Sequence, residues 1–271
     1  MVRNLHVATA QLPLPPAGAD RVAVTTTAAA ILDGATAFEP ASMPASRYAE
    51  RLAAALTASL TAAPETPLHD VLAEAISMTA RSLELSGPDG PSSTVAVARL
   101  SGDRIDLLAL GDSIIAYDTP AGPAILTDDR LDLLGLPERD SYRQRLTSGT
   151  GDDGTHQALL RQLQRHQRQH RNQPDGYWIA AAAPAAAHQA RTLSIPTAST
   201  AWIVLATDGA ADIIQYLGAD DWPAIAHQDA TGLAALLQRC HSWEEHADPH
   251  GRLLPRAKRH DDKTIAAVSI R

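Results

Sequence analysis

The sequence predicts a single α+β domain built on antiparallel strands, and three observations support this fold class. Short segments of extended character, bounded by turn residues, occur near both ends and in the middle of the chain. Two amphipathic helical patterns lie between the first and second groups of these segments, and Pro64 separates them. The turn Ser101-Gly102-Asp103 joins two strand-like segments directly, which is typical of an antiparallel hairpin.

The length and composition fit this prediction. A chain of 271 residues is long enough for one large domain or two small ones, and a hydrophobic content of 45% is ample for a core. We expect one domain spanning residues 1–271. Because only 4% of the residues are aromatic, the core is predicted to consist of Leu, Val, Ile and Ala.

Charge and cysteine content narrow the function classes. The net charge of −8, the pI near 5.7 and the lack of a basic stripe argue against nucleic acid as a partner and favour a bound cation. The single cysteine, Cys240, excludes an internal disulfide framework, so we expect a cytoplasmic protein. No apolar run approaches membrane-spanning length and no secretion signal is recognisable, so no membrane association is predicted.

The first third of the chain predicts strands followed by paired helices. Strands are expected at Leu5 to Gln11, Arg21 to Thr26 and Ala28 to Leu32. A first helix follows Pro44, and Thr66-Pro67 begins a second one, so the two are expected to pack as an antiparallel pair. Their apolar faces carry Tyr48, Leu52, Leu56 and Leu60 in the first helix, and Leu68, Val71, Leu72, Ala75, Ile76 and Leu83 in the second.

The middle of the chain predicts three more strands and a polar segment. The strands are expected at Thr94 to Leu100, Arg104 to Leu110 and Ile114 to Tyr117, and the second of them is apolar on both faces apart from Asp106. Such a strand belongs between two layers rather than at a solvated surface. The polar segment runs from about 119 to 175 and contains a predicted helix from Thr155 to about Asn172.

Two interpretations of the variable segment 119–175 remain open: a solvated helix with a mobile loop, or a lid over a substrate site. Beyond it, Tyr177 to Ala180 and Arg191 to Ile195 are predicted as edge strands, and Trp202 to Ala206 as a buried strand. Further predicted elements are helices at Asp212 to Tyr216 and Gly232 to Leu237, a solvated helix end holding His241, Glu244, Glu245, His246 and His250, a basic tail from Arg252 to His260, and a last strand, Ile265 to Ile270.

Carboxylates stand at the ends of several predicted strands. Asp33 and Asp208 each close an apolar run and are followed by a glycine, Asp261 opens the last strand, and Asp112 follows another strand. A carboxylate beside a sheet core costs several kcal/mol unless it is paired or bound to a cation. Hard cations such as Mg²⁺ and Mn²⁺ prefer oxygen ligands, so two or three such ions would suit the pattern. Separate helix caps and turns are the alternative explanation.

Five motifs resemble, in the same order, those of the metal-dependent protein phosphatases of the 2C type (the PPM family) in their bacterial form. The motifs are Leu32-Asp33-Gly34, Ser93-Thr94, Gly111 to Ala116, Leu205 to Asp212, and Asp261 to Thr264. The resemblance covers essentially the whole chain. It implies a four-layer αββα sandwich, in which two central β-sheets are flanked by antiparallel helix pairs and metals bind at one end.

The resemblance also implies roles for individual residues. Asp33 would bridge two metals, with the carbonyl of Gly34 as a further ligand, and Asp208 and Asp261 would complete this primary site. The catalytic residues would then be Asp33, Asp208 and Asp261. In this family a hydroxide shared by two ions, Mn²⁺ or Mg²⁺, attacks phosphorus in line, and no protein nucleophile is needed.

Three further acidic residues resemble accessory positions of the family. Asp20 would contact a metal-bound water, whereas Asp112 and Asp212 would serve a third, weaker metal. The chain departs from the family pattern close to Asp20. Ala19 replaces the usual Glu or Gln, and no arginine lies between Leu12 and Asp20 to grip the phosphate.

These departures leave the phosphate contact and the function partly open. Arg21, Arg3 or a residue from elsewhere must replace the missing arginine, and Ala35 to Phe38 replaces the usual Gly-rich segment after Asp-Gly. The expected function is a metal-dependent phosphatase of phosphoserine and phosphothreonine in proteins. The alternatives are a catalytically weakened pseudophosphatase that acts as a binding or regulatory module, and a small-metabolite phosphatase. The sequence does not indicate the oligomeric state.

Overall fold

The strands form two five-stranded sheets in the computed structural model, which describes residues 5–38, 43–87, 89–151 and 153–270. The strand order is β1-β10-β9-β6-β7 in one sheet and β2-β3-β4-β5-β8 in the other, and every pairing is antiparallel. The strands are β1 (Leu5–Leu12), β2 (Arg21–Val24), β3 (Ala28–Gly34), β4 (Ser93–Ser101), β5 (Arg104–Leu110), β6 (Ile114–Tyr117), β7 (Ala124–Leu126), β8 (Arg191–Pro196), β9 (Trp202–Ala206) and β10 (Lys263–Ile270).

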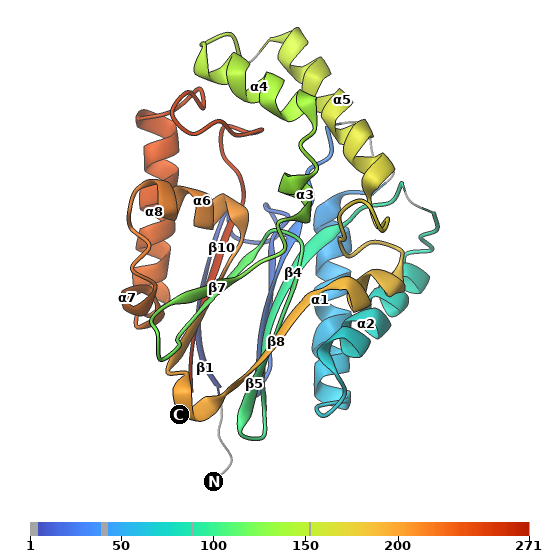
Figure 1. Cartoon of the computed structure of the whole chain (residues 1–271), viewed down its shortest axis with the longest axis vertical. Helices are drawn as coiled ribbons and strands as arrows, with labels where there is room; N and C mark the ends of the chain where they lie inside the picture. Colours follow the sequence, from blue (N-terminus) through green and yellow to red (C-terminus); the bar gives the residue numbers. More distant parts are fainter. Residues whose placement is uncertain (1–4, 39–42, 88, 152, 271) are drawn as a thin grey trace.

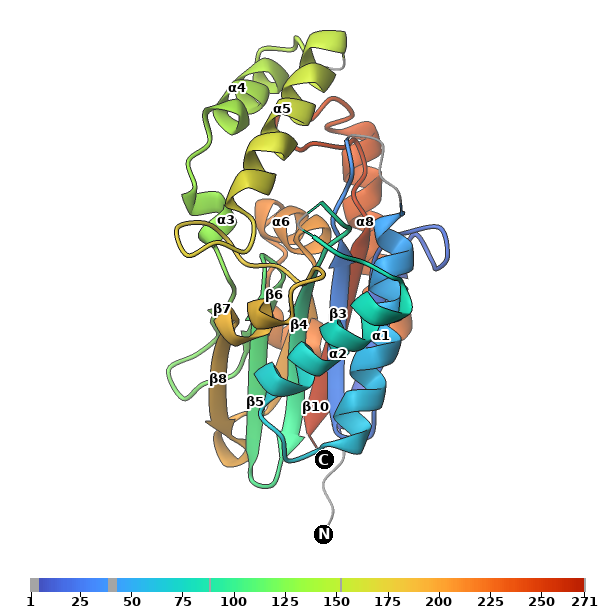
Figure 2. The ribbon, with the colours of Figure 1, turned by 90° about the vertical axis from the view of Figure 1, so that its right-hand side faces the viewer.

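Helices cover the outer face of each sheet, as Figures 1 and 2 show. The antiparallel pair α1 and α2 packs on the β2–β8 sheet, while α6, α7 and α8 pack on the β1–β7 sheet. The helices are α1 (Ala45–Ala62), α2 (Leu68–Ser82), α3 (Arg130–Leu133), α4 (Pro137–Thr147), α5 (Gly154–His170), α6 (Asp208–Tyr216), α7 (Trp222–Ala226) and α8 (Ala230–His246), with two 3-10 helices, η1 (Pro184–Gln189) and η2 (Thr197–Ser199). The predicted four-layer sandwich is confirmed.

The strand residues alternate between two hydrophobic cores. In β3, Ile31 packs in the core between the sheets, whereas Leu32 packs against α1 and α2. In β5, Leu107 faces the other sheet and Leu108 faces the helices. Because successive side chains of a strand point to opposite faces, a strand between two layers must be apolar throughout. This confirms the interpretation of the apolar run that follows Arg104.

The polar segment is more structured than predicted. Helices α4 and α5 form an arch at the end of the molecule opposite the termini (Figure 1). They share a small core of their own, formed by Leu136, Tyr142, Leu146, Leu160 and Leu163. Helix α5 agrees with the predicted helix, but α4, α3 and β7 were not predicted. Helix α4 escaped prediction because it buries only Glu138, Tyr142 and Leu146 in a polar sequence.

Two other predictions need correction, and one further helix was not predicted. Tyr177 to Ala180 is not a strand, because Tyr177 and Ala180 form only isolated bridges, with Arg171 and Ser93. Helix α8 continues well beyond Leu237 to His246, and the short α7, capped by Asp221, was missed.

Within the described ranges, no helix combines the length and the hydrophobicity needed to cross a lipid bilayer.

The core between the sheets should dominate stability. Ile31 has no exposed surface, so Ile31→Ala should leave a cavity and lower the free energy of unfolding by about 2–5 kcal/mol. Urea denaturation followed by circular dichroism would measure the loss. The control is Leu133→Ala at a side chain that is 72% exposed, which should change stability by less than about 0.5 kcal/mol. Equal effects of the two substitutions would contradict this assignment of the core.

Candidate metal centre

The acidic residues singled out in the sequence converge at the end of the two sheets that faces the α4–α5 arch. Asp33 is the penultimate residue of β3, Asp208 is the first residue of α6 directly after β9, and Asp261 lies just before β10. Asp20 precedes β2, and Asp112 follows β5. Five segments that are distant in the sequence therefore deliver carboxylates to one place.

Two glycines allow these segments to approach one another. A Cβ atom at Gly209 would lie 2.2 Å from the carbonyl oxygen of Asp262, so only glycine lets the start of α6 pack against the segment before β10. A Cβ atom at Gly34 would lie 2.9 Å from the Cβ of Ala19. The glycine after each of the two strand-end aspartates is thus what brings that aspartate beside its acidic neighbours.

Hydrogen bonds from hydroxyl groups and backbone amides hold the loop that carries Asp20 against the strands of the acidic centre. The Thr207 hydroxyl donates to Oδ2 of Asp20 at 3.0 Å and accepts from the Thr264 amide at 3.0 Å, which ties β9, β10 and the β2 loop together. Asp262 accepts from the Ala19 amide at 2.6 Å and so holds the same loop. No role could be assigned to Asp262 from the sequence, because it could be recognised there only as the second residue of a carboxylate pair.

Asp33 is the centre of the primary carboxylate group. Its carboxyl is close enough to those of Asp20, Asp208 and Asp261 for all three to act on it electrostatically. Burial, followed by the charges of Asp20, Asp208 and Asp261, raises the pKa of Asp33 well above its usual value. Burial and then Asp261 likewise raise the pKa of Asp208. Burial raises the pKa of Asp20 to about 7, since its hydrogen bonds to Thr264 and Thr207 offset only part of this effect.

A second acidic group adjoins the first through Asp208. Burial and then the charge of Asp208 raise the pKa of Asp112 to about 8. Desolvation by the surrounding protein, followed by the charges of Asp208 and Asp132, raises the pKa of Asp212 to about 7, although Asp212 as a whole residue is exposed. Asp132 was missed in the sequence, because it belongs to α3 in the polar segment and follows no apolar strand.

The residues present fit divalent cations. Oδ1 of Asp20 is buried and has no hydrogen-bond partner, and burial together with neighbouring carboxylates raises the pKa values of Asp20 and Asp33, so a bound cation would stabilise their charged forms. No three of the clustered aspartates, within the described residues, bring their oxygens all within 4.8 Å of one another. Mg²⁺ and Mn²⁺ keep several waters and take few protein carboxylates per ion, so an open set of this kind suits them.

Two adjoining clefts of about 210 and 220 Å³ open over the acidic group, and both are lined by Asp261, Leu131 and Phe38. The first cleft also contains Lys258, whose ammonium group forms an ion pair with the carboxylate of Asp261. Burial alone would lower the pKa of Lys258, but the neighbouring carboxylates of Asp261, Asp33 and Asp262 outweigh it and raise the pKa. A cation therefore stands beside the primary carboxylates.

The structure narrows the search for the missing arginine. The guanidinium of Arg21 donates to the carbonyls of Gly18 and Asp20, both at 2.7 Å, so it holds the β2 loop and lines neither cleft. Arg3 lies outside the described residues. Among the described residues, the geometry therefore favours a residue from elsewhere in the chain over Arg21.

The predicted solvated helix end is wrong for one residue, Glu244. Its side chain is fully buried, and its Oε2 lies 2.7 Å from Nζ of Lys263 and 3.0 Å from Nδ1 of His260. The predicted basic tail is likewise a folded loop, because Arg256 forms an ion pair with Asp248 at 2.7 Å. This loop carries Lys258 and Asp261, so the buried ion pairs anchor one wall of the acidic centre.

Two antiparallel sheets between helix layers, with carboxylates gathered at one end, define the class of metal-dependent phosphatases with a two-sheet sandwich. Residues 19–252 match the family model described as Protein phosphatase 2C. The chain therefore belongs to the protein phosphatase 2C family, whose members are metal-dependent phosphoprotein phosphatases, that is, phosphoric monoester hydrolases with a divalent metal cofactor. A comparison with curated protein sequences gave no match.

Solved structures of similar fold belong to the same group of enzymes. Serine-threonine phosphatase 2C from Toxoplasma gondii is 16% identical with a TM-score of 0.56, over 99% of this chain and 95% of that one. The catalytic domain of the phosphatase PstP, crystallised with two manganese ions, is 15% identical with a TM-score of 0.54, over 99% of both chains. The phosphatase MsPP from Mycobacterium smegmatis is 16% identical with a TM-score of 0.52, over 98% and 97%. At these low sequence identities, the structural similarity shows the fold alone.

Removal of the Glu244 carboxylate should destabilise the protein strongly. Glu244→Gln would leave Lys263 as a buried ammonium without its counter-ion, and such a loss typically costs about 3–5 kcal/mol. Urea denaturation would measure the change in the free energy of unfolding. The matched control is Glu245→Gln at the exposed neighbouring position, where almost no change is expected. Wild-type stability of Glu244→Gln would show that the buried pair is not an anchor.

Proposed function

We propose that this chain hydrolyses phosphoserine and phosphothreonine esters of proteins with Mn²⁺ or Mg²⁺ held by Asp33, Asp208 and Asp261. The observation that supports this most directly is the position of Asp33 near the end of β3, where the carboxyls of Asp20, Asp208 and Asp261 are all close enough to act on it electrostatically. A carboxylate between two others is the arrangement needed to bridge two ions. The Gly34 carbonyl, at the end of β3, is proposed as a further ligand.

Each surrounding residue has a proposed role. When bound, divalent ions supply water activation and neutralisation of the charge that develops on the phosphoryl group. Asp20 is positioned to accept a hydrogen bond from water through its unpaired Oδ1. Asp112 and Asp212 line the second cleft together with Asp208, which raises the pKa of both, so they are the proposed site of a third ion.

Lys258 is our candidate for the cation that binds the substrate phosphate. It lies in a cleft that also contains Asp261, and 30% of its side chain is exposed. Once an ion shares the charge of Asp261, the ammonium group is available to a phosphate oxygen on the same side. Lysine is a common phosphate ligand, although as a point charge it lacks the bidentate geometry of arginine.

The α4–α5 segment is proposed as a lid-like wall of the substrate site. Gln164 of α5 binds the loop after Gly34 on both sides, donating to the Thr36 carbonyl at 2.7 Å and accepting from the Phe38 amide at 3.0 Å. Arg139 and Arg143 of α4 also line the second cleft and would favour acidic phosphoprotein substrates. Cytoplasmic location remains a prediction from the sequence.

Loss of a primary ligand should abolish turnover. Asp208→Asn should lower Mn²⁺-dependent hydrolysis of an aryl phosphate by more than about 100-fold, since even outer-shell changes at metal sites cost about 10–100-fold. Treatment with a chelator should do the same to the wild type, and added Mn²⁺ or Mg²⁺ should restore activity. The control is Asp175→Asn, an exposed Asp-Gly aspartate, which should remain active. Full activity of Asp208→Asn would refute the proposed function.

Substitution of Lys258 should weaken phosphate binding without weakening metal binding. A hydrogen bond from a charged group contributes about 1.5–3 kcal/mol, so Lys258→Gln should raise KM and the inhibition constant of inorganic phosphate about 10–100-fold. Lys258→Arg should recover most of this loss. The affinity for Mn²⁺, measured by calorimetry, should not fall, because Lys258 competes with the ion for Asp261.

Arg259→Gln is the matched control for Lys258, because Arg259 is an exposed cation on the same loop and lines neither cleft of the acidic group. Its KM should equal that of the wild type. An unchanged KM in Lys258→Gln would exclude the phosphate contact, even if Asp208→Asn is inactive.

The family match does not favour the alternatives of a non-catalytic regulatory module or a small-metabolite phosphatase. Both are separable by one comparison of substrates. Hydrolysis of a phosphopeptide panel, with little turnover of phosphorylated metabolites, is expected. Mn²⁺ binding without turnover of either class would instead indicate a pseudophosphatase, and preference for metabolites would indicate the other alternative.

A further inference from the structure

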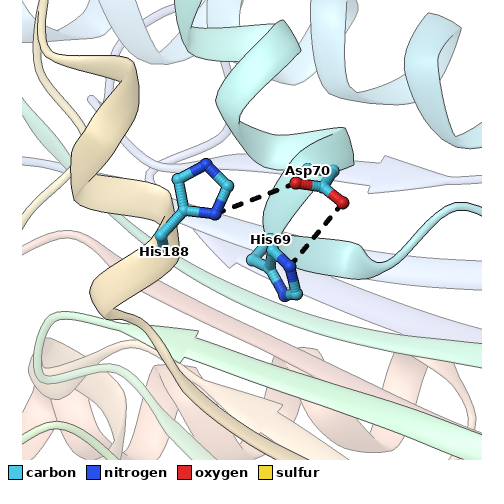
Figure 3. Close-up of side chains that lie close together, drawn as sticks. All are labelled: His69, Asp70 and His188. Carbon is cyan, nitrogen blue, oxygen red and sulfur yellow. Dashed lines mark ion pairs between the residues drawn. The ribbon is translucent and has the colours of Figure 1, made fainter.

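A second group of potential metal ligands lies outside the acidic centre. His69 and Asp70, in the first turn of α2, face His188 in η1, as Figure 3 shows. Nε2 of His69 lies 3.6 Å from Oδ2 of Asp70, and Nδ1 of His188 lies 3.8 Å from Oδ1. One ligand atom from each residue lies within 4.8 Å of the other two. None of the three residues lines either cleft at the acidic centre.

The three side chains can close around an ion with little movement. Bond lengths of about 2.0–2.2 Å in a tetrahedral zinc site place neighbouring ligand atoms roughly 3.4 Å apart, whereas the ligand atoms here lie within 4.8 Å of one another, so the side chains would have to draw together by at most about an ångström and a half. The side chains of His69, Asp70 and His188 are 40%, 46% and 48% exposed, so they are free to turn, and water can supply the fourth ligand. The two imidazole rings already lie 5.1 Å apart between centroids.

A second histidine cluster in the protein shows what would prevent metal binding. His241, Glu244 and His260 also bring ligand atoms within 4.8 Å, but Lys263 already neutralises Glu244 at 2.7 Å. Asp70 has no such cation: in the part of the chain that the structure describes, its carboxylate forms ion pairs only with the two imidazoles. A dication at Asp70 would therefore displace no competing charge.

We propose that His69, Asp70 and His188 bind one transition-metal dication of the Zn²⁺ type. Two imidazoles and one carboxylate with an open position suit Zn²⁺, whereas Mg²⁺ prefers oxygen ligands alone. The ion would join α2 to η1, two segments that already pack together through the buried Ala187. It would thereby fasten the connection between α5 and β8, which contains Tyr177 and Ile179 of the first cleft, to the outer helix layer.

Calorimetric titration of the full chain with Zn²⁺ in excess Mn²⁺ tests this proposal. Zinc that displaces Mn²⁺ from the acidic centre does so equally in every variant, so differences between variants report on the histidine cluster. His69→Gln and His188→Gln should each remove one zinc equivalent or weaken its binding more than tenfold, because even outer-shell changes cost about 10–100-fold. Asp70→Asn should also weaken it. The Zn²⁺-induced rise in melting temperature should be reduced in the same variants.

The control is His227→Gln, an exposed histidine at the end of α7, which should bind zinc as the wild type does. Mn²⁺-dependent hydrolysis should be unchanged in all four variants, which also reports that they fold. Anomalous diffraction at the zinc edge should give a peak between the three residues. Wild-type zinc binding in His69→Gln and His188→Gln, loss of the zinc site only in His260→Gln, or the absence of the anomalous peak would each overturn the proposal.

Discussion

The burial of neighbouring carboxylates is the constraint on which this structure depends. Burial and the charges of Asp20, Asp208 and Asp261 all disfavour an ionised Asp33, so this carboxylate opposes folding unless positive charge compensates. The fold nevertheless forces the approach, through Gly34, Gly209 and the hydroxyl of Thr207. Bound divalent cations, the cofactor of this family, would supply the positive charge that this centre needs in the native protein.

Much of this arrangement could be predicted from the sequence, because the relevant signals are local. The strand from Arg104 to Leu110, apolar on both faces apart from Asp106, indicated a place between two layers, and Asp-Gly after an apolar run marked Asp33 and Asp208. The sandwich of two sheets followed from the resemblance of the motifs to the family. Periodicity could not predict α4, since a helix that packs mainly on its neighbour α5 needs few apolar residues. Nor could it predict that Asp132, in the short helix α3, comes close enough to Asp212 to raise its pKa, because that approach depends on the folded path of the polar segment.

The loop before β10 shows why buried charge is difficult to recognise in a sequence. Glu244 belongs to a run of polar residues, yet Lys263, His260 and Arg256 all reach it from the following loop and strand. Asp248 accepts hydrogen bonds from three successive backbone amides, of Arg252, Leu253 and Leu254. A segment that looks like a basic tail is thereby given a fixed path, and only pairing across the fold distinguishes it from a solvated one.

This fixed loop also gives a physical account of the missing arginine. The chain has only two lysines, Lys258 and Lys263, and both belong to the segment that presents Asp261. Lys263 is buried against Glu244 and fixes the start of β10, whereas Lys258 is partly exposed and faces the carboxylates. The loop before β2, where the family places its arginine, instead uses Arg21 to bind its own carbonyls. If Lys258 binds the phosphate as proposed, the cation for the substrate comes from the loop before β10 rather than from the loop before β2.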